Sequence, residues 1–262
     1  MSYYFPVQRR QTIVEYISRR GSASVTELAE LCQVSPMTIR RDLDLLEREE
    51  ILMRTHGGVI YLGDSRAHEE TFDRKVSYQD QLKDRIAAYA VRHFVTNDAV
   101  LFMEGGTTVT RMVDHMVRAG FTGLTVVTNG LRTACALQSL DSTNNVICTG
   151  GILRHVSSTF VGPQAEDCFR EMHADVAFFS AVGFTWDEGF TDPNMLEREI
   201  KLIMRASAAR TIILLDSTKF GKKSLLTVFT PSEVDVLITD RRAPAFLLEE
   251  LRRQGVDVHV VS

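Results

Sequence analysis

The chain of 262 residues lacks the long apolar runs that cross membranes. No stretch approaches the roughly eighteen consecutive apolar residues that indicate a spanning helix. Its first residues, MSYYFPVQRRQ, also lack the apolar core of a secretory signal peptide. We therefore expect a cytoplasmic protein with no membrane partner.

Cysteine is scarce, and the 4 cysteines have no paired spacing: Cys32, Cys135, Cys148 and Cys168. This scatter argues against a disulfide framework or a zinc site. The 7 histidines likewise form no ligand cluster along the sequence. We therefore expect neither a metal nor a cofactor.

The common nucleotide and hydrolase motifs are also missing. FGKKS lacks the Walker spacing, no GxGxxG follows the first strand, and no GxSxG elbow occurs. There is no excess of positive charge either, because the net charge is −4 and residues 1–62 hold 8 Lys/Arg and 8 Asp/Glu. Any nucleic-acid binding must therefore come from the placement of the basic residues.

The first sixty residues show helical periodicity in three segments: RRQTIVEYISRRG (9–21), VTELAELC (25–32) and SPMTIRRDLDLLEREE (35–50). In the last segment Ser35 is a good N-cap and Pro36 suits the first helical position. Its apolar residues Ile39, Leu43 and Leu46 define one buried face. Short helices joined by a tight turn, the last with a polar and basic start, predict a helix-turn-helix.

The last helix would present its opposite face to DNA. At about 100° per residue, Met37 and Arg41 point away from Ile39, and Thr38 and Arg40 lie on the flanks. The following hairpin, ILMRTHGGVIY, would form a wing near the DNA backbone or minor groove. We therefore expect contacts to double-stranded DNA from Ser35, Met37, Thr38, Arg40, Arg41, Arg54 and His56. The alternative is a plain three-helix bundle whose arginines are merely solvated.

Several short motifs of this segment occur together: ELA at Glu27–Ala29, VS at Val34–Ser35, TIRRDL at Thr38–Leu43, LE at Leu46–Glu47, and R-HGG ending at Gly58. In this combination the segment resembles the N-terminal domain of the DeoR-type family of bacterial sugar-metabolism repressors. The resemblance implies a winged helix-turn-helix domain over residues 1–62 that binds operator DNA.

Residues 63–80 are polar, mixed in charge and without apolar periodicity. This composition is typical of a hinge between domains. A flexible tether without fixed contacts is the alternative. We expect the second domain to span residues 81–262.

The second domain alternates apolar strand-like runs with amphipathic helical segments. The runs are AVLFM, LTVV, NVIC, DVAFFSAV, TIILL, VDVLIT and VDVHVV. Continuous apolar strands separated by helices predict an α/β fold with a mostly parallel sheet that is covered on both faces. In such folds ligands bind beyond the carboxyl ends of the strands.

Small and polar residues collect at these strand ends: Glu104, Gly105, Gly106, Thr107, Thr108, Thr128, Asn129, Gly150, Gly151, Gly183 and Asp216–Lys219. Each turn alone is typical of an ordinary connection, but the set favours a phosphorylated ligand held by backbone N–H groups. Lys219 is the expected counter-charge, with an ordinary surface lysine as the alternative. Arg154 is expected to contact the rest of the ligand.

Four motifs of this region match the DeoR-type sensor domain, which is related to ribose-5-phosphate isomerase. They are D-x-G-T-T with Glu104 in place of the aspartate, TN at Thr128–Asn129, GG-x-L-R at Gly150–Arg154, and DSSKFG at Asp216–Gly221. The resemblance implies a sugar-phosphate-isomerase-like domain, a phosphorylated sugar effector, and a homo-oligomer, either a dimer or a tetramer.

The acid–base groups of the isomerases are not found at the matching place. Those enzymes carry a GADE turn followed by KGGG, whereas this chain has Gly183–Trp186 without an acid and no KGGG. Asp187 and Glu188 follow, and a shifted alignment would restore an acid pair, which keeps an enzyme as the alternative. We expect a sensor that holds its ligand without converting it. Relief of repression is the family expectation, and tighter DNA binding with effector stays open.

Overall fold

The computed structural model describes residues 6–20, 22–48, 52–54, 58–61 and 70–262. The chain divides into two compact units, residues 1–68 and residues 69–262. Among the described residues, no helix has the length and apolar character needed to cross a membrane.

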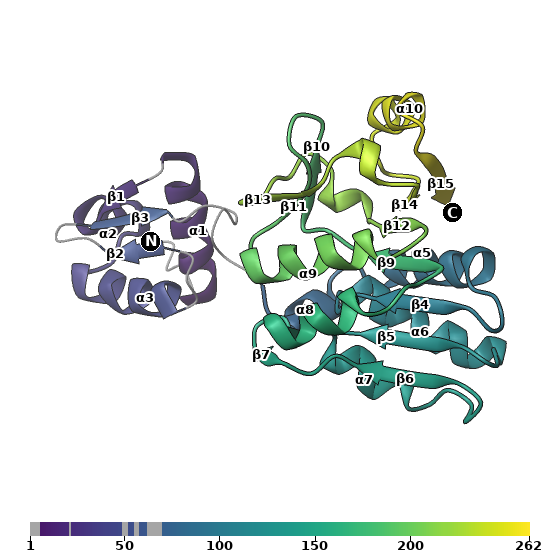
Figure 1. Ribbon diagram of the computed structural model, residues 1–262. Helices are drawn as coiled ribbons and strands as arrows, with labels where there is room; N and C mark the ends of the chain where they lie inside the picture. The colour runs from purple at the N-terminus through teal and green to yellow at the C-terminus, as the bar shows by residue number, and fades with distance from the viewer. Residues whose placement is uncertain (1–5, 21, 49–51, 55–57, 62–69) are drawn as a thin grey trace. The chain divides into compact units, whose positions relative to one another are not determined.

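The first unit contains α1 (Pro6–Arg20), β1 (Ser22–Ser24), α2 (Val25–Cys32), α3 (Pro36–Arg48), β2 (Leu52–Arg54) and β3 (Gly58–Tyr61) (Figure 1). The helices bury a common core that includes Ile13, Leu28 and Ile39. The strands form an antiparallel sheet in the order β1-β3-β2, so a third strand joins the expected hairpin. A Cβ on Gly58 would lie 2.3 Å from the Ala23 carbonyl oxygen, so glycine there lets β1 approach β3.

The second unit is built on a seven-stranded sheet in the order β15-β14-β12-β9-β4-β5-β6. Its strands are β4 (Val100–Met103), β5 (Thr125–Thr128), β6 (Asn145–Cys148), β9 (Val176–Phe179), β12 (Thr211–Leu214), β14 (Val236–Asp240) and β15 (Asp257–Val261). Every neighbouring pair is parallel. The expected parallel α/β fold is therefore confirmed.

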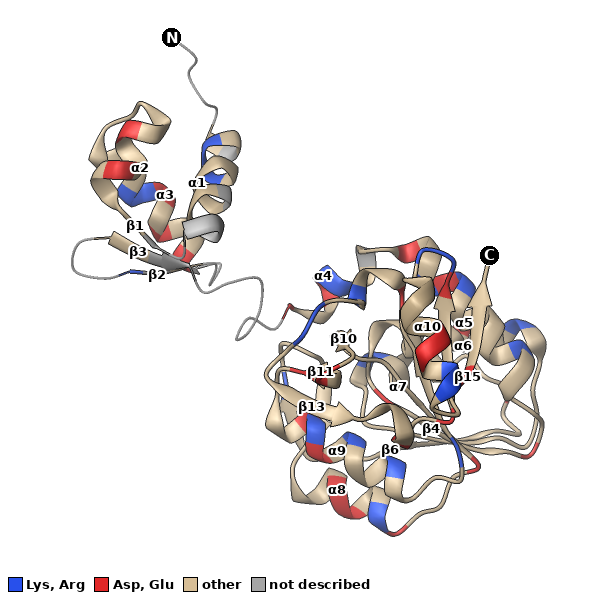
Figure 2. Ribbon diagram, turned by 90° about the horizontal axis from the view of Figure 1, so that it is seen from above, with Lys and Arg blue, Asp and Glu red and all other residues tan. Residues whose placement is uncertain are grey.

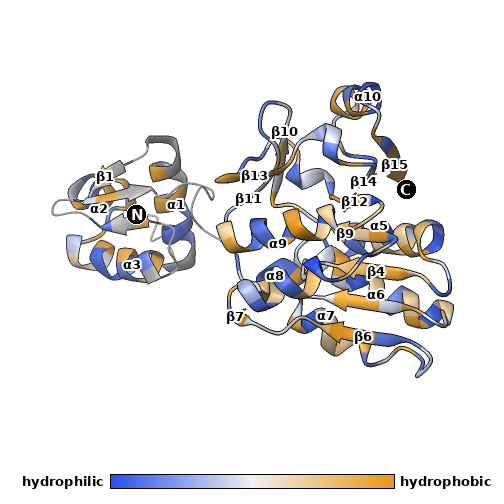
Figure 3. Ribbon diagram, in the orientation of Figure 1, coloured by the Kyte–Doolittle hydropathy of each residue, from blue (hydrophilic) through white to orange (hydrophobic). Residues whose placement is uncertain are grey.

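Helices cover both faces of this sheet, as Figure 1 shows. One face packs against α5 (Asp80–Phe94), α6 (Thr107–Ala119) and α7 (Leu131–Leu137). The other packs against α8 (Pro163–Arg170), α9 (Met195–Ala206) and α10 (Ala245–Arg253). The central strands are strongly hydrophobic whereas the helices alternate in colour in Figure 3, because the strands are buried on both faces and each helix on only one.

Two small sheets accompany the large one. The hairpin of β7 (Ile152–Arg154) and β8 (Thr159–Val161) follows β6. An antiparallel sheet in the order β10-β11-β13 combines β10 (Gly183–Thr185), β11 (Gly189–Asp192) and β13 (Leu226–Phe229). The expected strand DVAFFSAV therefore ends at Phe179, and the chain turns out of the main sheet before β10 begins. Two 3-10 turns, η1 (Ser217–Lys219) and η2 (Pro231–Glu233), flank β13 in sequence.

The second unit begins earlier than the expected residue 81. The short helix α4 (Phe72–Ser77) contacts α6, and the backbone N–H of Phe72 donates to the Val156 carbonyl oxygen at 2.8 Å. Burial of the Phe72 ring explains why this part of the expected hinge is fixed to the unit. The rest of that hinge, residues 63–69, lies outside the described residues.

Candidate functional site

The start of α3 is fixed by the N-cap that the sequence indicates. The Ser35 hydroxyl accepts a hydrogen bond from the Thr38 N–H at 3.2 Å and lies 3.0 Å from the Thr38 hydroxyl. This cap sets the direction of the first turn of the helix, where helix-turn-helix proteins contact base edges.

Acidic side chains of α3 form hydrogen bonds and ion pairs with other residues of the first unit. Asp42 is buried and accepts from Arg9 Nε at 2.6 Å, and this hydrogen bond raises the pKa of Arg9. Asp44 forms an ion pair with Arg54, which joins α3 to β2. Arg54, expected near the DNA, is therefore held by α3.

The arginines of the same helix remain exposed. Within the described residues, neither Arg40 nor Arg41 has a hydrogen-bond or ion-pair partner, and both lie away from the buried Ile39. Figure 2 shows both basic and acidic residues on α3, and acidic residues on α2. Met37 is also exposed on α3, whereas His56 lies outside the described residues. A helix face with free guanidinium groups is suited to phosphate and base contacts.

In the second unit, Glu104 and the glycines after it form the turn between β4 and α6. The Gly105 N–H donates to Asn129 Oδ1 at 3.2 Å, which ties this turn to the end of β5. A Cβ on Gly106 would lie 2.1 Å from Glu104 Oε1 and 2.3 Å from Ser180 Oγ, so a larger residue would displace the Glu104 and Ser180 side chains. Gly106 is the N-cap of α6 and supplies no side-chain hydrogen bond. The first N–H groups of α6 are therefore not capped by a side chain.

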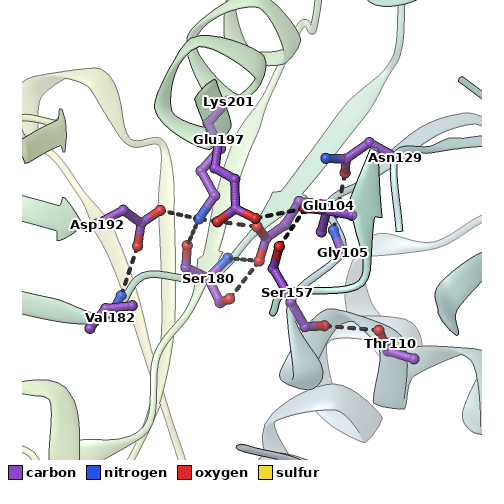
Figure 4. Close-up of polar contacts among 12 residues, drawn as sticks. Glu104, Gly105, Thr110, Asn129, Ser157, Ser180, Val182, Asp192, Glu197 and Lys201 are labelled. Carbon is purple, nitrogen blue, oxygen red and sulfur yellow. Dashed lines mark hydrogen bonds and ion pairs between the residues drawn. The ribbon is translucent and has the colours of Figure 1, made fainter. Parts of the chain in front are cut away.

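The Glu104 carboxylate is engaged inside the protein (Figure 4). Its Oε1 accepts from the backbone N–H of Ser180 at 2.9 Å and from the Ser180 hydroxyl, and its Oε2 lies 3.0 Å from Lys201 Nζ. Lys201 also binds Asp192 and donates to the Ser180 carbonyl oxygen at 2.6 Å. Burial alone would lower the pKa of Lys201, but Asp192 and Glu104 raise it, so the ammonium stays charged. Glu104 thus joins the ends of β4 and β9.

Arg154 belongs to a second buried group of contacts. Its guanidinium lies 2.7 Å from Glu197 Oε1 and donates to the Ser157 hydroxyl at 3.1 Å. The Thr159 hydroxyl donates to the same carboxylate oxygen at 2.6 Å. Burial alone would raise the pKa of Glu197, but the hydrogen bonds of Ser157 and Thr159 and the charge of Arg154 lower it. This group joins the β7–β8 hairpin to α9.

The other predicted positions on β5 and after β6 also have structural partners. Thr128 Oγ1 accepts from the Gly130 N–H at 3.0 Å, and Asn129 Nδ2 donates to the Phe160 carbonyl oxygen at 3.2 Å. Gly150 and Gly151 have φ of +65° and +107°, which favour glycine. These residues shape the strand-end edge, while Thr107 is partly exposed and Thr108 is buried at the start of α6.

Lys219 lies beside two lysines that the sequence analysis did not identify, Lys75 and Lys83. Lys83 is buried on α5 and donates to the Lys75 carbonyl oxygen, and burial lowers the pKa of Lys83 to about 8. The neighbouring Asp216 opposes this shift, and the charges of Lys219 and Lys75 add to it. Burial likewise lowers the pKa of Lys219, whose ammonium has no hydrogen-bond partner within the described residues. We call Lys75, Lys83 and Lys219 the lysine cluster.

A sequence signal for part of this cluster did exist. Lys83 falls between Leu82 and Ile86 on the buried face of α5, where a lysine is unusual. The contacts of Glu104 with Ser180 and Lys201, and of Lys201 with Asp192, gave no such signal, because these residues are distant from Glu104 along the chain. The acid pair considered for an isomerase, Asp187 and Glu188, is exposed in the turn between β10 and β11.

Comparison with known proteins identifies the family. Residues 79–241 match the family model of the DeoR C terminal sensor domain, and residues 9–64 match the DeoR-like helix-turn-helix domain. The chain is similar to the HTH-type transcriptional regulator GolR of Listeria innocua serovar 6a, with 33% identity over 98% of this chain and 100% of the relative. It is also similar to the lactose phosphotransferase system repressor of Streptococcus mutans serotype c, with 30% identity over 89% of this chain and 91% of the relative.

Among solved structures, ribose 5 phosphate isomerase A of Neisseria gonorrhoeae is similar with a TM-score of 0.40 and 15% identity, over 55% of each chain. The two family models together span most of the described residues, one on each compact unit. The chain therefore belongs to the DeoR family of DNA-binding transcriptional regulators, with an N-terminal helix-turn-helix domain and a C-terminal sensor domain.

Proposed function

We propose that this regulator represses a carbohydrate-utilisation operon and is released from its operator by a phosphorylated sugar. The observation that carries the proposal is the lysine cluster, where Lys219 has no bonded partner within the described residues and burial lowers the pKa of Lys83 and Lys219. Asp216 and Glu70 favour the charged lysines without cancelling the shift, so a phosphate group with about −1.5 to −2 charges would supply further counter-charge. It would also offset the repulsion between the lysines.

The start of α6 would provide the second part of the phosphate site. Gly106 leaves its first N–H groups without a side-chain cap, and the positive end of the helix dipole favours an anion there. α4, which carries Lys75, contacts α6. In this proposal Glu104, Thr128 and Asn129 hold the edge in shape, and Thr107 and Lys219 contact the ligand.

The helix α4 would couple the ligand to DNA binding. It is the first described element after residues 62–69, which connect the two units, and it brings Lys75 to the cluster. Its described contacts with the unit include the backbone hydrogen bond from Phe72 to Val156, the hydrogen bond from Lys83 to the Lys75 carbonyl oxygen and an exposed ion pair between Asp73 and Arg132. A ligand that binds one position of α4 better by a few kcal/mol would change operator occupancy strongly.

Binding without conversion is supported by the state of the carboxylates. Glu188 pairs with Lys223 on the surface at 3.0 Å, and the buried Glu104 and Asp192 are bound to Lys201. Glu197 is bound to Arg154. A general base needs a free lone pair within reach of the proton that it removes. Carboxylates held in this way are suited to positioning rather than to isomerisation.

A thermal-shift screen tests the proposal. Sugar phosphates are compared with the same sugars without phosphate, and a ligand at one hundred times its Kd should stabilise the protein by about 2.7 kcal/mol. The stabilising sugar phosphate should then release operator DNA in a gel-shift titration and give no product in an NMR time course. Equal stabilisation by the unphosphorylated sugars contradicts the phosphate site, and product formation contradicts the sensor. Sedimentation of the full chain should give a dimer or tetramer.

A further inference from the structure

The exposed face of α3 carries an apolar side chain in its first turn. The side chain of Met37 is 58% exposed, the largest value for a large apolar residue among the described residues of the first unit. Leu45, nearer the other end of the helix, is 42% exposed. A lone exposed apolar residue is common on protein surfaces, so the surroundings of Met37 decide whether it has a role.

Those surroundings are arranged for an anionic partner. Arg41 lies one turn further along the same face, Arg40 lies beside it, and neither has a partner within the described residues. Of the acids of the helix, Asp42 is buried with Arg9, and Asp44, whose side chain is half-exposed, is paired with Arg54. Met37 therefore stands among cations that are free to contact phosphates or bases.

The hydroxyls of the first turn hold the helix start in place. The Ser35 hydroxyl caps the helix and lies within hydrogen-bond distance of the Thr38 hydroxyl. Beside these hydroxyls, the turn offers a partner the flexible thioether of Met37, which fills apolar gaps well and is only a weak hydrogen-bond acceptor.

We propose that Met37 contacts the 5-methyl group of a thymine in the operator and so helps to determine its sequence. Among the four bases, thymine alone presents an apolar group in the major groove. The first turn of a recognition helix is the part that reaches base edges. The inference rests on the DNA binding of the DeoR family and adds the base feature that one side chain reads.

The test removes the methyl group and the side chain in turn. Wild-type protein is used to select its preferred sites from random double-stranded DNA, and each thymine of the selected site is then replaced by deoxyuridine, which lacks only the methyl. In gel-shift titrations at fixed salt, one such replacement per half-site should weaken wild-type binding three- to tenfold. The same replacement should not change the DNA affinity of Met37→Ala, because this variant already lacks the side chain that contacts the methyl group.

Three further results complete the test. Met37→Leu should keep the sensitivity to deoxyuridine, and Leu45→Ala, the matched exposed residue of the same helix, should behave as wild type. Circular dichroism should show that Met37→Ala stays folded. If deoxyuridine lowers the DNA affinity of wild type and Met37→Ala equally, or lowers neither, the proposed role of Met37 is overturned. The proposal that the protein binds DNA is not affected by that result. Failure of wild type to select any sequence would instead overturn the proposed function.

Discussion

The free arginines of α3 and the lysine cluster of the sensor unit are both suited to phosphate, but they differ in burial. Arg40 and Arg41 lie on an exposed helix face, while Lys83 is buried and Lys219 is partly buried. The surroundings of Lys83 lower its pKa to about 8.

Under the proposed function, the size of the partner accounts for this difference. DNA supplies many phosphates, so each exposed contact can be weak and screened by salt. A small effector supplies one phosphate, and a few contacts must carry its affinity. Burial makes each of those contacts stronger because the effective dielectric is lower. The same burial makes the empty site costly in repulsion, which a ligand then relieves.

Lys201 shows that burial alone does not indicate a ligand site. It is as buried as Lys83, but Asp192 and Glu104 neutralise it and raise its pKa. The useful distinction is therefore between a buried lysine that is bonded to carboxylates and has a raised pKa, and a buried lysine whose pKa stays lowered although an acid is nearby.

The largest expected effect comes from breaking the buried ion group. Lys201→Met would leave Glu104 and Asp192 buried without a cation, and the free energy of unfolding should fall by about 3–5 kcal/mol. Urea denaturation of the full chain, followed by fluorescence of Trp186, the 1 tryptophan of the sequence, measures this in the sensor unit. Lys223→Met, which removes an exposed ion pair with Glu188, should cost less than about 1 kcal/mol. Equal losses of unfolding free energy in Lys201→Met and Lys223→Met would mean that the buried ion group stabilises the protein no more than the exposed pair does.

The second prediction concerns the exposed side of the comparison. Arg41→Ala should weaken operator binding by about 1–3 kcal/mol per copy, roughly five- to a hundredfold, with no change in thermal stability. A gel-shift titration at fixed salt measures the loss. Arg118→Ala, an exposed arginine on α6 of the sensor unit, is the control and should bind DNA as wild type does. Unchanged affinity in Arg41→Ala would remove this residue from the interface.

The third prediction addresses the lysine cluster. Lys219→Ala should remove a charge-assisted bond of about 1.5–3 kcal/mol and lower effector affinity roughly ten- to a hundredfold. DNA binding without effector should persist, so the variant would stay on its operator when effector is added. Titration calorimetry and gel shifts measure the two effects, with Lys223→Ala as the control. A wild-type response to effector in Lys219→Ala would contradict the assignment.

The smallest effect is a dependence on pH. The pKa of Lys83 is about 8 in the free protein, so the ammonium that an anion needs is lost as pH rises through 8. Above that pH, Lys83 must take up a proton when the effector binds. Effector affinity should therefore fall about threefold between pH 7.5 and 8.5. Calorimetry in buffers of different ionisation enthalpy detects the proton uptake. Lys83→Met should bind the effector more weakly and lose this pH dependence. If the effector affinity of Lys83→Met still changes with pH as in wild type, the titrating group is a different one.

The sequence by itself determined the local elements of this protein. The Ser35 cap and the spacing of Ile39, Leu43 and Leu46 predicted α3, and the structure has this helix with that buried face. Capping and periodicity act between residues a few positions apart, so they can be read directly from the sequence. The apolar runs predicted the parallel sheet for the same reason.

Only the tertiary structure decided which side chains are free and which are engaged. Glu104 is conspicuous in the sequence, but Lys201, 97 positions later, occupies its carboxylate, and Arg54 is held by Asp44. Lys83 and Lys219 come together although they lie 136 positions apart in the chain. Whether two charges meet depends on where distant strands and helices cross, and no local pattern records that. Neighbouring residues thus determine the helices and strands of this chain. Contacts between residues that are distant in sequence determine which cations remain available for an anion.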